Sequence, residues 1–119
     1  MILAVVDDLM FTSKIKSAAT HLGVPLAFAR SAEAALAEMR KSAPTLVIFD
    51  LNSPRTNPIA IVAAMKAEPA LASIPTIGFV SHVDTSTIDA ARQAGIDEIL
   101  ARSAFTAQLG EILGRGQRP

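Results

Sequence analysis

The chain has 119 residues, half of them apolar, which is enough for one sizeable hydrophobic core and argues against intrinsic disorder. Eleven basic residues balance 11 acidic ones, so nothing favours nucleic acid or an anionic lipid surface as a partner. The absence of cysteine excludes disulfides and thiolate metal sites and fits a reducing compartment. The apolar run at residues 2–6 is too short for a signal peptide or a membrane span, so we expect a cytoplasmic protein.

The first part of the chain predicts two strand–helix units. Gly23 can end the first helix because glycine tolerates the left-handed conformation that follows a helix. Ser31 can cap the second helix by accepting a hydrogen bond from its free N–H groups. The expected elements are a strand at residues 2–6, a helix at 9–22, a strand at 24–29 and a helix at 32–41.

The rest of the chain predicts three further units. The run Leu46-Val47-Ile48-Phe49 is continuously apolar, as expected for a strand buried on both faces of a sheet. The polar tail at residues 114–119 is expected to fray. The expected elements are strands at 45–49, 76–80 and 98–100, a helix that starts at Pro58, a helix capped by Asp84 or Thr85 that ends at Gly95, and a helix capped by Ser103.

Strict alternation of strands and helices predicts an α/β fold. We expect a three-layer, doubly wound, five-stranded parallel sheet with strand order 2-1-3-4-5, which is the flavodoxin-like (βα)5 arrangement. The five units use the whole chain, so residues 1–119 are predicted to form a single domain. Ligands of such sheets bind beyond the carboxyl ends of the strands, where the strand order reverses between strands 1 and 3.

Three aspartates are expected to meet at that edge, because Asp7 and Asp8 follow the first strand and Asp50 follows the third. Neighbouring carboxylates repel and raise each other's pKa values, and a bound Mg²⁺ (or Mn²⁺) would remove that conflict. Ser81, after the fourth strand, can donate a hydroxyl hydrogen bond, and Arg102, after the fifth, supplies a fixed positive charge. This set suits a phosphoryl group, and the carboxylate of Asp50 can be the nucleophile that forms an aspartyl phosphate.

With these motifs the chain resembles the receiver domains of bacterial two-component response regulators. The resemblance implies that Asp50 accepts a phosphoryl group from a sensor histidine kinase, a phosphotransfer protein or a small phosphodonor. It also implies that Asp8 and Asp50 ligate Mg²⁺ together with the backbone carbonyl of Asn52, while Asp7 acts mainly through water. It covers the whole chain and rests on Asp7-Asp8, the stretch from Leu46 to Pro54, Ser81, and the pattern Ala91…Ala94-Gly95.

The resemblance further implies how the signal leaves the domain. The face formed by the helix that ends at Gly95, the strand at 98–100 and the helix after Ser103 would change its affinity for a downstream protein on phosphorylation. Receivers often form homodimers through the first of these helices. The chain is therefore expected to be a signalling module and not an enzyme, although such a module can catalyse its own phosphorylation and dephosphorylation.

Several residues depart from the receiver pattern. Arg102 and Ser103 stand where the family usually has Lys and Pro, and Ile99 replaces the aromatic switch residue of the fifth strand. Arginine keeps the charge but is longer and planar, and a serine makes a cis peptide bond costly. His82 follows Ser81, where the family has a small residue, and we interpret it as a gate or a surface residue.

These departures leave other hypotheses open. The second hypothesis is a degenerate receiver that binds a partner without being phosphorylated. A third, less favoured, is an aspartate-nucleophile phosphatase, whose second catalytic Asp would stand at the position of Asn52. A nucleotide or flavin site is disfavoured because no glycine-rich loop follows the first strand. Each aspartate alone has an ordinary interpretation as a loop or helix-capping residue, and their joint placement is what favours a site.

Overall fold

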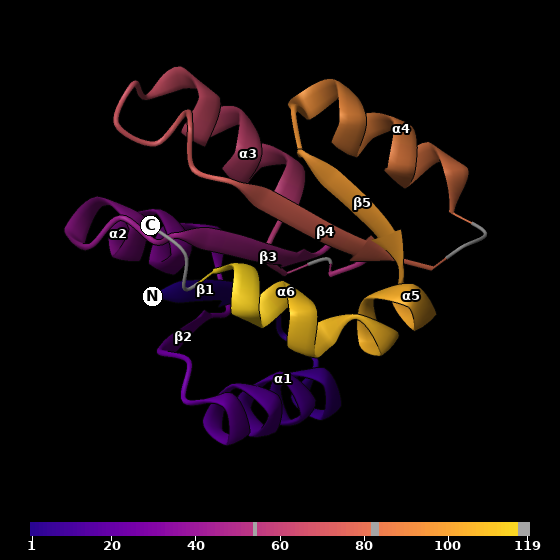
Figure 1. Ribbon diagram of the computed structural model, residues 1–119. Helices are drawn as coiled ribbons and strands as arrows, with labels where there is room; N and C mark the ends of the chain where they lie inside the picture. Colours follow the sequence, from indigo (N-terminus) through magenta and orange to yellow (C-terminus); the bar gives the residue numbers. More distant parts are fainter. Residues whose placement is uncertain (54, 82–83, 117–119) are drawn as a thin grey trace.

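The computed structural model describes residues 1–53, 55–81 and 84–116 (Figure 1). Within these ranges five strands form one parallel sheet in the order β2-β1-β3-β4-β5, which confirms the predicted fold class and strand order. Pro54 and His82 lie outside the described residues. The strands are β1 (Ile2–Val5), β2 (Leu26–Ala29), β3 (Leu46–Asp50), β4 (Thr76–Val80) and β5 (Glu98–Ala101).

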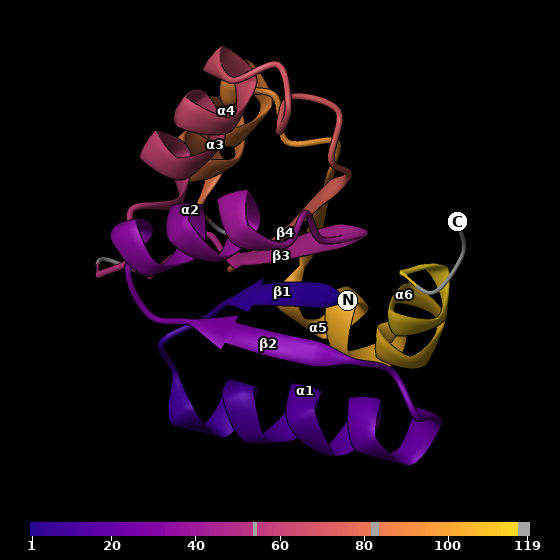
Figure 2. The ribbon, with the colours of Figure 1, turned by 90° about the vertical axis from the view of Figure 1, so that its left-hand side faces the viewer.

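Helices cover both faces of the sheet. Helices α1, α5 and α6 lie against one face and α2, α3 and α4 against the other, so the domain has three layers (Figures 1 and 2). No helix in the described ranges is long and apolar enough to cross a membrane. The helices are α1 (Leu9–Leu22), α2 (Ala32–Lys41), α3 (Pro58–Ala67), α4 (Thr85–Ala94), α5 (Arg102–Ala107) and α6 (Leu109–Arg115).

Each face of the sheet has its own hydrophobic core, because successive side chains of a strand point to opposite sides. Leu3 and Val47 pack with α2, α3 and α4, whereas Ile2 and Ile48 pack with α1, α5 and α6. All four side chains are nearly or fully buried. The central strands β1 and β3 are therefore apolar on both faces, which explains their continuous apolar sequences and fixes the ends that carry the aspartates.

The last predicted helix differs from the structure. A single helix capped by Ser103 was expected, but α5 already begins at Arg102, directly after β5, and its N-cap Ala101 makes no side-chain hydrogen bond. Ser103 therefore lies in the first turn of the helix and is not its cap. The helix is also interrupted at Gln108, which ends α5 and precedes α6. The early start matters for the site because it holds Arg102 at the carboxyl edge of the sheet.

Residues 114–116 were predicted to belong to a frayed tail, but the structure holds them in place. Helix α6 continues through Arg115, whose guanidinium lies 3.1 Å from a carboxylate oxygen of Glu98. Gly116 is buried, and its carbonyl accepts a hydrogen bond from the hydroxyl of Thr45. Burial of Ile112 holds this last turn against β1 and β3. Residues 117–119 lie outside the described ranges.

Gly78 in β4 gives a first prediction, because a β-carbon at this position would lie 2.7 Å from the buried side chain of Leu51. We expect Gly78→Ala to lower the free energy of unfolding by about 1–3 kcal/mol, since the buried side chain of Leu51 would have to shift to admit the new methyl group. Gly114→Ala is the matched control, because a β-carbon there meets nothing within 4 Å and alanine favours a helix. Urea unfolding measures both; equal stabilities for the two variants would contradict the prediction.

Candidate functional site

The sheet brings the predicted aspartates to one edge. Strands β1 and β3 are neighbours, with Val5 paired to Phe49, so the residues that follow β1 lie beside the end of β3. There they line one cleft with a volume of about 440 Å³. The cleft is lined by Asp7, Asp8, Leu9, Met10, Asp50, Asn52, Ser53 and Arg102.

Asp50 is the most buried of the three aspartates. It ends β3 and is only 4% exposed. Burial raises the pKa of its carboxyl above the usual range, and the negative charges of Asp8 and Asp7 add to this effect. The backbone N–H of Asn52, 3.0 Å from Oδ1, and the Arg102 guanidinium lower the pKa but do not cancel the rise. The site therefore favours the protonated form of the Asp50 carboxyl more than water does.

Arg102 is the first residue of α5, and its guanidinium lies beside the carboxylate of Asp50. Its Nη2 atom lies 3.8 Å from Asp50 Oδ2. Its guanidinium carbon lies 4.9 Å from the ring centre of Phe11 and 5.7 Å from that of Phe79, within the range of cation–π attraction. The ring of Phe79 also stacks on those of Phe11 and Phe105, with centroids 4.7 and 4.5 Å apart. The aromatic rings thus orient the cation toward Asp50.

Asp7 and Asp8 each have a local partner. Asp8 caps α1, because its Oδ1 accepts hydrogen bonds from the backbone N–H groups of Met10 (2.8 Å) and Phe11 (3.2 Å). Asp7 Oδ2 lies 3.5 Å from Nε of Arg55, an exposed residue of the loop after β3. The capping interpretation and the site interpretation of Asp8 are therefore compatible, since a carboxylate has a second oxygen.

The predicted metal ligands share the cleft without forming a tight cluster. In the described ranges, no three acidic or histidine side chains gather closely enough to hold an ion. Asp50 faces Arg102, Asp7 faces Arg55, and Asp8 faces the start of α1, so each carboxylate is drawn to a different partner. The donors are all oxygen atoms, which suit Mg²⁺ or Mn²⁺ and not a soft metal. The residues present therefore fit a hard divalent ion that takes few protein ligands.

Ser81 lies beside the cleft but does not line it. It lines an adjoining hollow of about 690 Å³ that also contains Phe11, Asn52 and Arg102. Its backbone N–H donates to Oδ1 of Asn52 at 2.8 Å. Ile99, at the position of the missing aromatic switch, is half-buried against the core under α2, α3 and α4. His82 lies outside the described residues.

Two residues of the site were not predicted from the sequence. Arg55 was missed because a single basic residue in a loop carries no pattern that indicates its partner. The side chain of Asn52 was also missed: only its backbone carbonyl was expected to act, yet its amide donates to Asp84 Oδ2 at 2.8 Å. The available signal was Asp84, one of the two candidate caps of the fourth predicted helix, which stands three residues after Ser81.

The raised pKa of Asp50 predicts a pH-dependent stability. The folded chain holds this proton more tightly than the unfolded chain, so the stabilising effect is complete at low pH and is lost as the pH rises through the raised value. We expect Asp50→Asn to be more stable than the wild type at pH 7 by on the order of 1 kcal/mol. Melting curves in metal-free buffer should show the difference shrinking toward acidic pH; an unchanged difference would contradict the assignment to Asp50.

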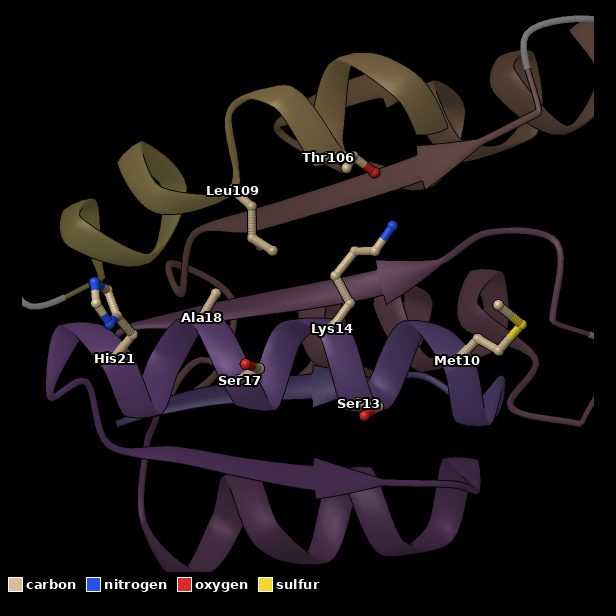
Figure 3. A pocket seen from close by; sticks show the side chains of 8 residues that line it. All are labelled: Met10, Ser13, Lys14, Ser17, Ala18, His21, Thr106 and Leu109. Atoms are coloured by element: carbon tan, nitrogen blue, oxygen red, sulfur yellow. The ribbon is translucent and has the colours of Figure 1, made fainter.

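A shallow groove adjoins the cleft on the side of α1. It has a volume of about 660 Å³ and lies between α1 and the α5–α6 segment (Figure 3). Met10 lines both the groove and the cleft, and the residue is 83% exposed. In the described ranges, the large apolar residues that are exposed all belong to α1, namely Leu9, Met10 and Leu22. The groove is lined by Met10, Ser13, Lys14, Ser17, Ala18, His21, Thr106 and Leu109.

Comparison with known proteins yields one family. A family model for the response regulator receiver domain matches residues 2–113. The phosphorylated cyanobacterial phytochrome response regulator RcpA is 25% identical, with 94% of this chain and 86% of that chain covered and a TM-score of 0.78. No curated protein matches the chain.

Two further solved structures have the same fold. The chemotaxis response regulator CheY4 of Vibrio cholerae is 19% identical, with coverage of 96% of this chain and 95% of that one and a TM-score of 0.82. The Mn²⁺-bound form of response regulator Rcp1 is also 19% identical, with coverage of 93% and 89% and a TM-score of 0.78. At this level of identity the likeness concerns the fold alone.

Proposed function

Because the chain belongs to the response regulator receiver domain family, we propose that it is a phosphoacceptor signalling module that takes a phosphoryl group on Asp50. The observation that carries the proposal is the burial of this carboxylate at the end of β3, in a cleft that it shares with two other aspartates and an arginine. Receiver domains act with histidine kinases and downstream targets, so the activity belongs to signalling and not to metabolism. We place this activity in the cytoplasm.

The proposed reaction is a displacement at phosphorus. A carboxylate oxygen of Asp50 forms a bond to phosphorus, the bond from phosphorus to the donor nitrogen or oxygen breaks, and the leaving group keeps that electron pair. The guanidinium of Arg102, 3.8 Å from Asp50 Oδ2, would stabilise the negative charge that the phosphoryl oxygens bring. The hydroxyl of Ser81 would donate a hydrogen bond to one of those oxygens.

We propose that a divalent ion, Mg²⁺ or Mn²⁺, is required. Its protein ligands would be Asp8, Asp50 and the backbone carbonyl of Asn52, with Asp7 acting through water. The oxygen-only donor set supports this assignment, as does the placement of three carboxylates along one cleft. When bound, the ion would neutralise charge between the carboxylates and the incoming phosphoryl group. The same cleft would serve the module's own dephosphorylation.

We propose that the protein phosphodonor, a sensor histidine kinase or a phosphotransfer protein, binds over the groove beside α1. Met10 is exposed and lines both the groove and the acidic cleft, so a protein seated on it would reach Asp50. We propose that the downstream target binds the face formed by α4, β5 and α5, and that any homodimer contact lies on the same face. Nucleic acid and membrane are not among the proposed partners, because the net charge is zero.

Incubation with a small phosphodonor such as acetyl phosphate, with and without Mg²⁺, tests the proposed function. Intact mass should show the gain of one phosphoryl group only when Mg²⁺ is present. A chain that gains nothing under any of these conditions is the degenerate receiver of the second hypothesis. One observation favours that alternative: Asp50 already has a cationic partner in Arg102.

A phosphatase remains the least supported function. It would need an acid/base carboxylate near the nucleophile at position 52, and this chain has the amide side chain of Asn52 there. Both ends of that amide are engaged in hydrogen bonds to the loop after β4. Steady turnover of a phosphoester would be required to revive this hypothesis.

A further inference from the structure

The side chain of Asn52 joins two loops at the edge of the sheet. Its Oδ1 accepts a hydrogen bond from the backbone N–H of Ser81, and its Nδ2 donates to Oδ2 of Asp84, each at 2.8 Å. Its own backbone N–H donates to Oδ1 of Asp50 at 3.0 Å. One residue therefore contacts the proposed phosphoacceptor and two points of the loop that leads from β4 to α4. We call these contacts the Asn52 bridge.

The far end of the bridge is the first turn of α4. Asp84 is the N-cap of this helix, and its Oδ1 accepts from the backbone N–H of Thr87 at 3.1 Å. Its Oδ2, the atom that Asn52 contacts, also accepts from the Thr87 hydroxyl at 2.7 Å. The hydroxyl of Thr87 and the other hydrogen bonds, including the one from Asn52, lower the pKa of Asp84 and keep it a charged acceptor. The cap and the bridge thus share one carboxylate.

The bridge is the polar connection between these two loops. In the part of the chain that the structure describes, every side-chain hydrogen bond between the loop after β3 and the loop after β4 comes from Asn52. This chain has no aromatic switch residue in β5. Ile99 stands at that position, packs against the apolar core and has no polar group that could respond to a change at Asp50. A change at Asp50 reaches α4 most directly through the contact that Asn52 makes with both.

We propose that Asn52 is a positioning residue that couples Asp50 to the start of α4. The proposal rests on the proposed function for its trigger, but the bridge itself belongs to the unphosphorylated chain. A phosphoryl group on Asp50 adds bulk and negative charge beside the backbone N–H of Asn52, so the backbone of Asn52 must then shift. Because the side-chain amide of the same residue holds Ser81 and Asp84, the loop and the α4 cap shift with it, which alters the face proposed for the downstream partner.

The bridge can be tested without any ligand by exchanging its two ends. Asn52→Asp places two carboxylates opposite each other, so the hydrogen bond between residues 52 and 84 is lost. Asp84→Asn places two amide groups opposite each other. If the new amide turns to remake the hydrogen bond, it no longer caps α4. Each single variant should speed amide hydrogen exchange in the first turn of α4 by about fivefold, the effect of losing roughly 1 kcal/mol of hydrogen bonding. The double variant restores one amide–carboxylate pair with its direction reversed, because Asn also caps helices well.

Exchange rates in the double variant should return to within about twofold of the wild type, because the hydrogen bond is remade. Wild-type rates in both single variants, or a double variant whose effects simply add, would overturn the bridge. Ser86→Ala is the matched control, since the Ser86 hydroxyl donates to Asp84 Oδ1 at 3.2 Å but takes no part in the bridge. It should leave the first turn of α4 close to the wild type.

The coupling is tested with Mg²⁺ and beryllofluoride, a mimic of the phosphoryl group, by NMR of backbone amides. In the wild type, amides next to Asp50 and those in the first turn of α4 should both shift. In Asp84→Asn the shifts near Asp50 should persist while those of α4 fall by more than half. Equal α4 shifts in the variant and the wild type would overturn the coupling. If beryllofluoride shifts no amide signal in the wild type, the proposed function fails. The hydrogen-exchange experiment still tests the Asn52 bridge in that case.

Discussion

Asp50→Asn is expected to gain no phosphoryl group from acetyl phosphate and Mg²⁺, under conditions in which the wild-type chain gains one. An amide is not a nucleophile toward phosphorus at neutral pH, and it removes the negative charge that attracts the ion. The substitution keeps the size of the side chain in a position that is only 4% exposed, so the fold should survive. Intact mass measures the result, and a peptide map of the wild type should place the group on Asp50.

Asp89→Asn serves as the matched control for this first prediction. Asp89 is an exposed acid of α4, and its loss should leave phosphoryl uptake at the wild-type level. Uptake by Asp50→Asn would contradict the prediction and point to another acceptor, such as the exposed His21. Loss of uptake in both variants would indicate that net charge, and not Asp50, controls the reaction.

The second large effect is expected for Mg²⁺ binding in Asp8→Asn. The substitution removes one of the carboxylates proposed to hold the ion, and we expect the dissociation constant to rise about tenfold or more, which is roughly 1.4 kcal/mol. Asn is as good an N-cap as Asp, so the hydrogen bonds to Met10 and Phe11 should remain and α1 should keep its start. Isothermal titration calorimetry measures the affinity directly, without phosphorylation.

Asp8→Ala separates the two roles of this residue. It should weaken Mg²⁺ binding as much as Asp8→Asn does, and in addition it should lower the free energy of unfolding by about 1 kcal/mol because the cap of α1 is lost. Unchanged Mg²⁺ affinity in both variants would remove Asp8 from the metal site and leave it as a helix cap. The same affinity in the wild type and in Asp89→Asn would exclude a general effect of charge.

The architecture was predictable because it follows from local patterns. Alternating apolar runs and helical spacings identified every strand, and caps such as Ser31 and Gly23 marked helix ends correctly. The break at Gln108 was not predicted, because the apolar residues on both sides of it fit one continuous helical stripe. Gly110 stands two residues after the break, but a single glycine inside a helical pattern does not by itself indicate an interruption.

The site was predictable only in part. Strand order brought Asp7, Asp8 and Asp50 to one cleft, as the topology required. How the three carboxylates turn within the cleft depends on nearby cations and N–H groups, such as those of Arg55 and Arg102. These contacts join residues that are far apart in the sequence, and no periodic pattern encodes them.

The position of Met10 offers a spectroscopic consequence. Met39 and Met65 are buried and Met1 is half-buried, so Met10 is by far the most exposed of the four methionines. A ¹³C label in the methionine methyl groups would therefore give one narrow, solvent-exposed signal at the rim that the cleft and the groove share. Its response to Mg²⁺ alone, and then to a phosphodonor protein, would separate ion entry from docking in a chain that has neither Trp nor Tyr to provide fluorescence.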